Sequence, residues 1–137
     1  MKSIFLVLAV TLGFGSFYGS GSYAHEGHDK LPGTVQAPHG GTVKGTSQIY
    51  IELVNEASGI KLYPLTHEMT PVTLKDVTIA GTAQAPKRKK EPVKFTSADD
   101  YFEAKVDAKG AYRYTLELTT TYKGKKEKVT FQIEPQS

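Results

Sequence analysis

The sequence predicts an all-β protein, a small antiparallel β-sandwich of about seven or eight short strands, with the immunoglobulin fold as one candidate topology. Three observations lead to this prediction. From residue 38 onward, apolar and polar residues alternate with the period of two that half-buried strands show. No segment keeps a helical period over several turns. The 137 residues include no cysteine, so the stability of the domain must come from packing rather than from disulfides.

The predicted strands of the N-terminal half carry apolar side chains at every second position, and they span residues 48–54, 60–63 and 72–79. The first two flank the turn Asn55–Gly59, so we expect them to form a hairpin. The third should be broken or bulged near Lys75 and Asp76. Residues 85–92, rich in charge and proline, are expected to link this region to the next strands.

The C-terminal half repeats the pattern, with predicted strands at residues 93–96, 102–106, 112–119 and 128–133. Asp107–Gly110 and Tyr122–Lys125 are predicted turns. The side chains that alternation places on the inward face of the last two strands are Tyr112, Tyr114, Leu116, Leu118, Val129, Phe131 and Ile133.

Residues 1–24 have the pattern of a secretory signal peptide. Lys2 provides a positive start, residues 4–12 are apolar, and small residues precede Ala24. The apolar stretch is shorter than the roughly 20 residues that a membrane span needs. We therefore expect cleavage after Ala24, a periplasmic or secreted location, and no stable membrane anchor after cleavage. An uncleaved N-terminal anchor is the alternative.

Cleavage would leave a flexible, histidine-containing arm at residues 25–37, followed by the β-domain at residues 38–137. The arm is polar and has no hydrophobic period. If the mature chain begins at His25, its α-amine and its imidazole can chelate one metal ion. Both are nitrogen donors suited to copper, nickel or zinc.

The four histidines are unevenly distributed, since His25, His28 and His39 fall within 15 consecutive residues. His39 precedes two glycines, whose backbone freedom would present the imidazole at the edge of the domain. His67 lies in a predicted loop with Met69, whose thioether suits copper. The candidate metal ligands are His25, His28, His39, His67 and Met69. Isolated loop histidines often bind nothing, and the sequence does not show whether His39 and His67 meet.

Other classes of function find little support. The chain has no nucleophile elbow, phosphate-binding loop or zincin motif, so we expect a protein that is not an enzyme. The formal charge of +3, from 17 basic and 14 acidic residues, is mild. No aromatic residues interleave with the basic run Lys87–Lys90, so no nucleic-acid partner is expected. That run is interpreted as a solvated loop, with binding to an anionic surface as the alternative.

Several short motifs resemble a known module. They are Pro-His-Gly-Gly-Thr-Val at residues 38–43, Tyr-Ile-Glu-Leu-Val at 50–54, Leu-Tyr-Pro-Leu-Thr-His at 62–67 and Pro-Val at 71–72. This combination resembles small periplasmic proteins and the N-terminal β-domain of adaptor (membrane fusion) subunits in heavy-metal efflux pumps.

The resemblance implies a small all-β domain that handles divalent or soft metal ions in the periplasm, with a histidine-rich arm ahead of it. His39 fits the family's histidine before the paired glycines, and His67 fits one that follows the second strand. The chain departs from the family at Gln48–Tyr50, where a histidine is frequent, and it lacks the adaptor's coiled-coil and lipoyl-like domains.

We therefore expect an exported, non-enzymatic protein that binds copper or zinc. It would buffer the ion or hand it to an efflux-pump or other envelope partner. The alternative is an interaction or structural module of the cell envelope, with incidental histidines.

Overall fold

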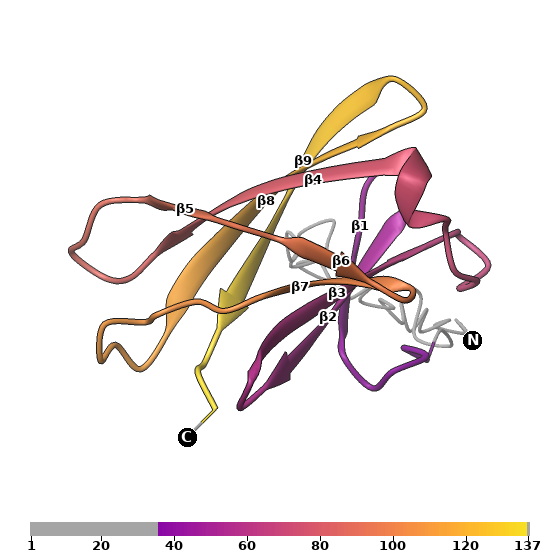
Figure 1. Cartoon of the computed structure of the whole chain (residues 1–137). Coiled ribbons are helices and arrows are strands. Elements are labelled where there is room, and N and C mark those ends of the chain that lie inside the picture. Colours follow the sequence, from indigo (N-terminus) through magenta and orange to yellow (C-terminus); the bar gives the residue numbers. More distant parts are fainter. Residues whose placement is uncertain (1–35, 137) are drawn as a thin grey trace, which may run out of the picture.

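Two antiparallel sheets, of five and four strands, make up the computed structural model, which describes residues 36–136 (Figure 1). The predicted signal peptide and most of the arm, including His25 and His28, lie outside the described residues. Within residues 36–136, no helix is long and apolar enough to cross a membrane.

The five-stranded sheet has the strand order β1-β2-β3-β7-β6. Its strands are β1 (Thr42–Gly45), β2 (Tyr50–Glu56), β3 (Gly59–Leu65), β6 (Thr96–Ala98) and β7 (Tyr101–Ala104). Strands β2 and β3 form the predicted hairpin, with Tyr50 opposite Leu65 at one end and Glu56 opposite Gly59 at the other. The hairpin turn is therefore shorter than the segment that the sequence predicts for it.

The four-stranded sheet has the order β5-β4-β8-β9. Its strands are β4 (Val77–Gln84), β5 (Glu91–Val93), β8 (Tyr114–Tyr122) and β9 (Lys125–Ile133). A single 3₁₀ turn, η1 (Leu74–Asp76), occupies the predicted break before β4. The β8–β9 hairpin closes through Lys123 and Gly124, whose φ angles of 47° and 75° match the twist of the strands that they join.

The core lies between the two sheets and is built from the alternating positions that the sequence predicts. The most buried apolar side chains are Ile49, Ile51, Ile60, Leu62, Leu65, Leu116, Leu118 and Phe131. The β-sandwich prediction is thereby confirmed.

Two predicted strands differ from the structure. Residues 93–96 are not one strand, because the chain leaves the four-stranded sheet at Val93 and enters the five-stranded sheet at Thr96. Alternation reports which face a side chain takes but not which sheet its backbone joins, so this crossing was not visible in the sequence. Because the chain crosses between the sheets here, β5 and β6 are separate strands, and residues 36–136 contain nine strands rather than the seven or eight predicted.

The prediction that Tyr112 faces the core is wrong. Its side chain is 70% exposed, and β8 begins two residues later at Tyr114. The turn closed by the N–H of Ala111 on the carbonyl of Ala108 (2.9 Å) precedes Tyr112 and keeps it outside the sheet.

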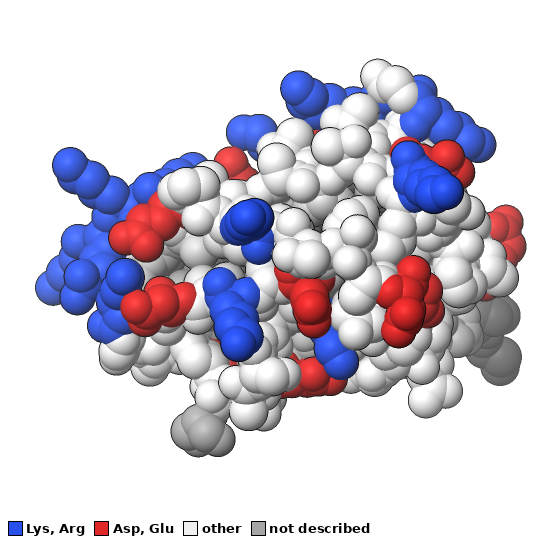
Figure 2. All heavy atoms as spheres, viewed as in Figure 1, with Lys and Arg blue, Asp and Glu red and all other residues white. Residues whose placement is uncertain are grey.

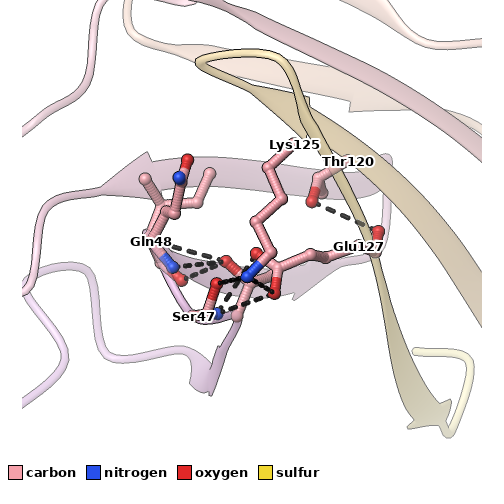
Figure 3. Close-up of polar contacts among 7 residues, drawn as sticks. Ser47, Gln48, Thr120, Lys125 and Glu127 are labelled. Atoms are coloured by element: carbon pink, nitrogen blue, oxygen red, sulfur yellow. Dashed lines mark hydrogen bonds and ion pairs between the residues drawn. The ribbon is translucent and has the colours of Figure 1, made fainter.

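A group of polar contacts joins the β1–β2 turn to the opposite sheet (Figure 3). The N–H of Ser47 donates to both carboxylate oxygens of Glu127 at 3.2 Å, and Lys125 Nζ donates to Ser47 Oγ at 2.6 Å. Thr120 Oγ1 donates to the carbonyl oxygen of Glu127 at 3.4 Å. The side-chain hydrogen bond with Ser47 is the largest cause that lowers the pKa of Glu127. The contact between Ser47 and Glu127 links residues 80 positions apart in the chain.

The core tyrosine of β8 leads to a prediction about alkaline stability. Burial raises the pKa of Tyr114 from 10.0 to about 12. As pH rises, the unfolded chain therefore releases this proton at a lower pH than the folded protein does. The stability that depends on neutral Tyr114 is fully present below about pH 10 and is lost as pH rises towards 12. In Tyr114→Phe the free energy of unfolding should fall less steeply with pH across this window. Urea unfolding at a series of pH values measures the slope.

The exposed residue Tyr112 offers the matched control, since Tyr112→Phe removes a hydroxyl that is not in the core. Its slope should equal that of the wild type. Equal slopes for Tyr114→Phe and the wild type would contradict the prediction.

Candidate metal site

His39 lies in a tight turn that immediately precedes β1. The N–H of Gly40 closes the turn on the carbonyl of Ala37 at 3.1 Å, and Gly40 has a φ of 71°, in the left-handed region. Gly41 is required for a different reason. A Cβ at this position would overlap the carbonyl oxygen of Leu53 and would lie 3.0 Å from Cγ of Glu52. The two glycines therefore let the turn form and press it against β2.

Glu52 is the partner of this turn. Ile51 and Leu53 face the core, so alternation places Glu52 on the outward face of the five-stranded sheet, yet it is fully buried. Its Oε1 accepts the N–H groups of His39 at 2.8 Å and of Gly41 at 2.9 Å, and its Oε2 lies 2.8 Å from His39 Nδ1. A buried carboxylate needs such partners, and residues 39–41 supply all three contacts.

The ring of His39 is held by a second contact. It stacks on Tyr63, with ring centroids 3.7 Å apart and an interplanar angle of 12°. Tyr63 lies directly opposite Glu52 in the β2–β3 ladder and packs in turn against Tyr101, at a centroid distance of 5.3 Å. Burial raises the pKa of the Tyr63 hydroxyl, which favours its neutral form. The imidazole is thus fixed both in position and in plane.

The contact with Glu52 also determines which nitrogen of His39 is available. A carboxylate accepts hydrogen bonds, so we assign the proton of a neutral imidazole to Nδ1 and the free lone pair to Nε2. Within residues 36–136, Nε2 has no hydrogen-bond partner, and the side chain is 32% exposed. A histidine that donates one ring N–H to a carboxylate is the usual form of a metal ligand, because the carboxylate orients the ring and raises its basicity.

His67 lies on the same face of the sheet. Its ring contacts Tyr50, with centroids 4.8 Å apart. Tyr50 and Glu52 are alternate residues of β2, so their backbones are about 7 Å apart along the strand. His67 and His39 therefore project over neighbouring outward positions, which the sequence alone could not show.

His39 and His67 contact different tyrosines, Tyr63 and Tyr50, and the structure shows no contact between the two histidines within residues 36–136. Met69 lies with His67 in the loop after β3, at a φ of 64°. Within the part of the chain that the structure describes, no group of three or more histidine, aspartate or glutamate side chains could hold a metal ion. His39 is thus one oriented candidate ligand, and a complete metal site would need donors from elsewhere.

Sequence reasoning missed Glu52 and Tyr63, the two residues that orient His39. A carboxylate at an outward strand position is ordinarily solvated, and a tyrosine there is ordinary in a strand. The pair of glycines after His39 was the one sequence feature that pointed to such a partner. Glycine allows the backbone to lie very close to another part of the protein, so the pair indicated that the turn packs against a neighbouring element.

Fold and site together define a β-sandwich protein that presents one oriented histidine on a sheet face. No protein-family model, no curated protein and no solved structure matches this chain. Its function must therefore be inferred from its own residues.

Proposed function

We propose that the protein is an exported, non-enzymatic metal-binding protein that holds copper or zinc and buffers the ion or hands it to an efflux-pump or other envelope partner. The observation that carries this proposal is the contact between His39 Nδ1 and the buried carboxylate of Glu52, at 2.8 Å. It leaves Nε2 as the nitrogen available to a metal ion. Stacking on Tyr63 supports the proposal, because a ring that is already ordered loses little entropy on binding.

The arm is the proposed source of further ligands. His28 precedes His39 by eleven residues, and a chain of that length can span up to about 35 Å, so His28 and His25 can return to His39. If the mature chain begins at His25, its α-amine adds a further nitrogen. His67 and Met69, which lie in one loop after β3, are additional candidates. Imidazole and amine nitrogens suit copper and zinc.

Calorimetric titration with Cu(II) and with Zn(II) tests the proposal. The untagged protein is used, with its N-terminus determined by mass spectrometry. We expect micromolar or tighter binding of at least one of the two ions. His39→Ala should weaken that binding at least about tenfold, and the double variant His25→Ala, His28→Ala should weaken it similarly. Since protons compete with metal for imidazole, affinity should also fall as the pH is lowered.

His67→Ala is the matched comparison, because it removes a histidine from the same sheet face without touching the contact with Glu52. It should weaken binding less than His39→Ala does. Binding that survives loss of His25 and His28 would contradict the role of the arm. Equal losses for His67→Ala and His39→Ala would contradict the special role of His39, and absence of binding to either metal would contradict the proposal as a whole.

A further inference from the structure

One end of the sandwich collects basic side chains from segments that are distant in sequence. A hollow of about 330 Å³ lies there, between the β4–β5 hairpin and the β7–β8 loop. Its basic lining residues are Arg88, Lys89, Lys94, Lys105 and Lys109. Lys87 precedes them in the β4–β5 loop, with a φ of 60°. Figure 2 shows Lys and Arg side chains gathered at the left of the molecule, where Figure 1 places the β4–β5 loop.

Little of this positive charge is compensated locally. Asp107 also lines the hollow, but Lys109 occupies it, with its N–H 2.8 Å from Oδ1 and its Nζ 3.2 Å from Oδ2. These hydrogen bonds lower the pKa of Asp107, which stays ionised and neutralises Lys109. Within residues 36–136, no ion pair engages Arg88, Lys89 or Lys94. Glu91 is the other carboxylate in the lining.

Lys90 of the β4–β5 loop also faces a carboxylate, at 3.4 Å from Glu117, and two lysines of the β8–β9 hairpin do the same. Lys125 lies 3.5 Å from Glu127, and Lys128 lies 3.4 Å from Glu117. That hairpin has four lysines, at positions 123, 125, 126 and 128, and it lacks the cluster of basic residues without ion pairs that Arg88, Lys89 and Lys94 form. It therefore serves as an internal comparison for the basic end.

The same end carries an exposed aromatic side chain. Tyr112, in the β7–β8 loop, is the one large hydrophobic residue that is exposed within residues 36–136, at 70%. The guanidinium of Arg113 lies 5.3 Å from the centre of its ring. Tyrosine is favoured at the headgroup level of membranes, where its ring is half in contact with lipid and its hydroxyl stays hydrated.

We propose that this end of the sandwich, formed by the β4–β5 and β7–β8 loops, docks reversibly on an anionic phospholipid membrane. Lipid phosphates would lie against Arg88 and Lys89, and Tyr112 would lie at the headgroup level. Clustered basic residues beside an exposed aromatic fit such a surface, because each basic residue near anionic lipid adds about fivefold to the affinity. The docking does not depend on metal binding, and it requires no membrane-spanning segment.

Co-sedimentation with vesicles tests this proposal. The wild type should bind phosphatidylglycerol vesicles at least about tenfold more tightly than phosphatidylcholine vesicles, and binding should weaken as salt increases. The triple variant Lys87→Gln, Arg88→Gln, Lys89→Gln should lose at least about tenfold in affinity. Tyr112→Ser should lose about threefold, and this loss should persist at high salt.

The control is Lys123→Gln, Lys126→Gln, Lys128→Gln, which makes the same change in net charge at the β8–β9 hairpin and should lose less than about threefold. All variants share the same N-terminal segment, so any membrane affinity of that segment is common to them. Equal losses in the two triple variants would overturn the proposal in favour of an effect of net charge. Absence of a preference for phosphatidylglycerol, or saturable binding of inorganic pyrophosphate without binding to vesicles, would also overturn it.

Discussion

Replacing Glu52 with alanine is expected to lower the free energy of unfolding by about 2 to 4 kcal/mol, because it removes the acceptor of two N–H groups beneath the turn. The carboxylate is fully buried and accepts hydrogen bonds from the N–H groups of His39 and Gly41 as well as facing His39 Nδ1. Alanine leaves these donors without an acceptor and opens a space beneath the turn. Because a domain is stable by only about 5 to 15 kcal/mol, the loss is a large share of the total. Urea unfolding followed by circular dichroism measures it.

Glu52→Gln separates the contribution of the negative charge of Glu52 from the contribution of its size. It keeps the size of the side chain and one oxygen acceptor, so its loss of stability should be clearly smaller than that of Glu52→Ala. Metal affinity should nevertheless fall about 10- to 100-fold, since the carboxylate that orients His39 is gone. A Glu52→Ala protein within about 1 kcal/mol of the wild type would contradict the first prediction.

Gly41→Ala should destabilise the fold by about 2 to 4 kcal/mol. The new Cβ would overlap the carbonyl oxygen of Leu53, which belongs to the backbone of β2 and cannot rotate away. Gly41 must therefore move, and the turn that carries His39 moves with it. Metal affinity and stability should fall together. Thermal unfolding and metal titration of the same preparation measure both effects.

Gly40→Ala is the matched control one residue earlier. No atom lies within 4 Å of the position that its Cβ would take, so only the strain of the left-handed φ of 71° remains. That strain should cost about 1 to 2 kcal/mol. If Gly40→Ala destabilises the protein more than Gly41→Ala does, close approach to β2 is not what requires Gly41.

Much of the fold could be predicted because local alternation determines it. The β2–β3 hairpin, the inward face of β9 and the break at η1 all follow from short stretches of sequence. Tyr112 and the passage from Val93 to Thr96 could not be predicted in the same way. In both places the backbone leaves a sheet while the alternation of apolar residues continues. The alternation does not specify which strand the backbone pairs with.

The candidate site could be predicted only in part. His39 was identified by its neighbouring glycines, but its orientation depends on Glu52, which lies 13 residues further along the chain. That contact requires β2 and the turn to lie against each other, and no local pattern specifies this. The position of His67 on the same face likewise depends on the β2–β3 register, which places Tyr50 opposite Leu65. Non-local contacts of this kind leave no local pattern.

The lengths of the outermost strands bear on how the protein resists aggregation without disulfides. Strands β5 and β6 each lie at the edge of a sheet and contain three residues, and β1 contains four. Edges this short give another chain few backbone groups to pair with. The remaining edge, β9, is nine residues long, but it carries Lys125, Lys126 and Lys128, and lysines on an edge strand disfavour pairing with another chain. Short edge strands and an edge rich in lysine therefore both disfavour pairing between copies of this chain.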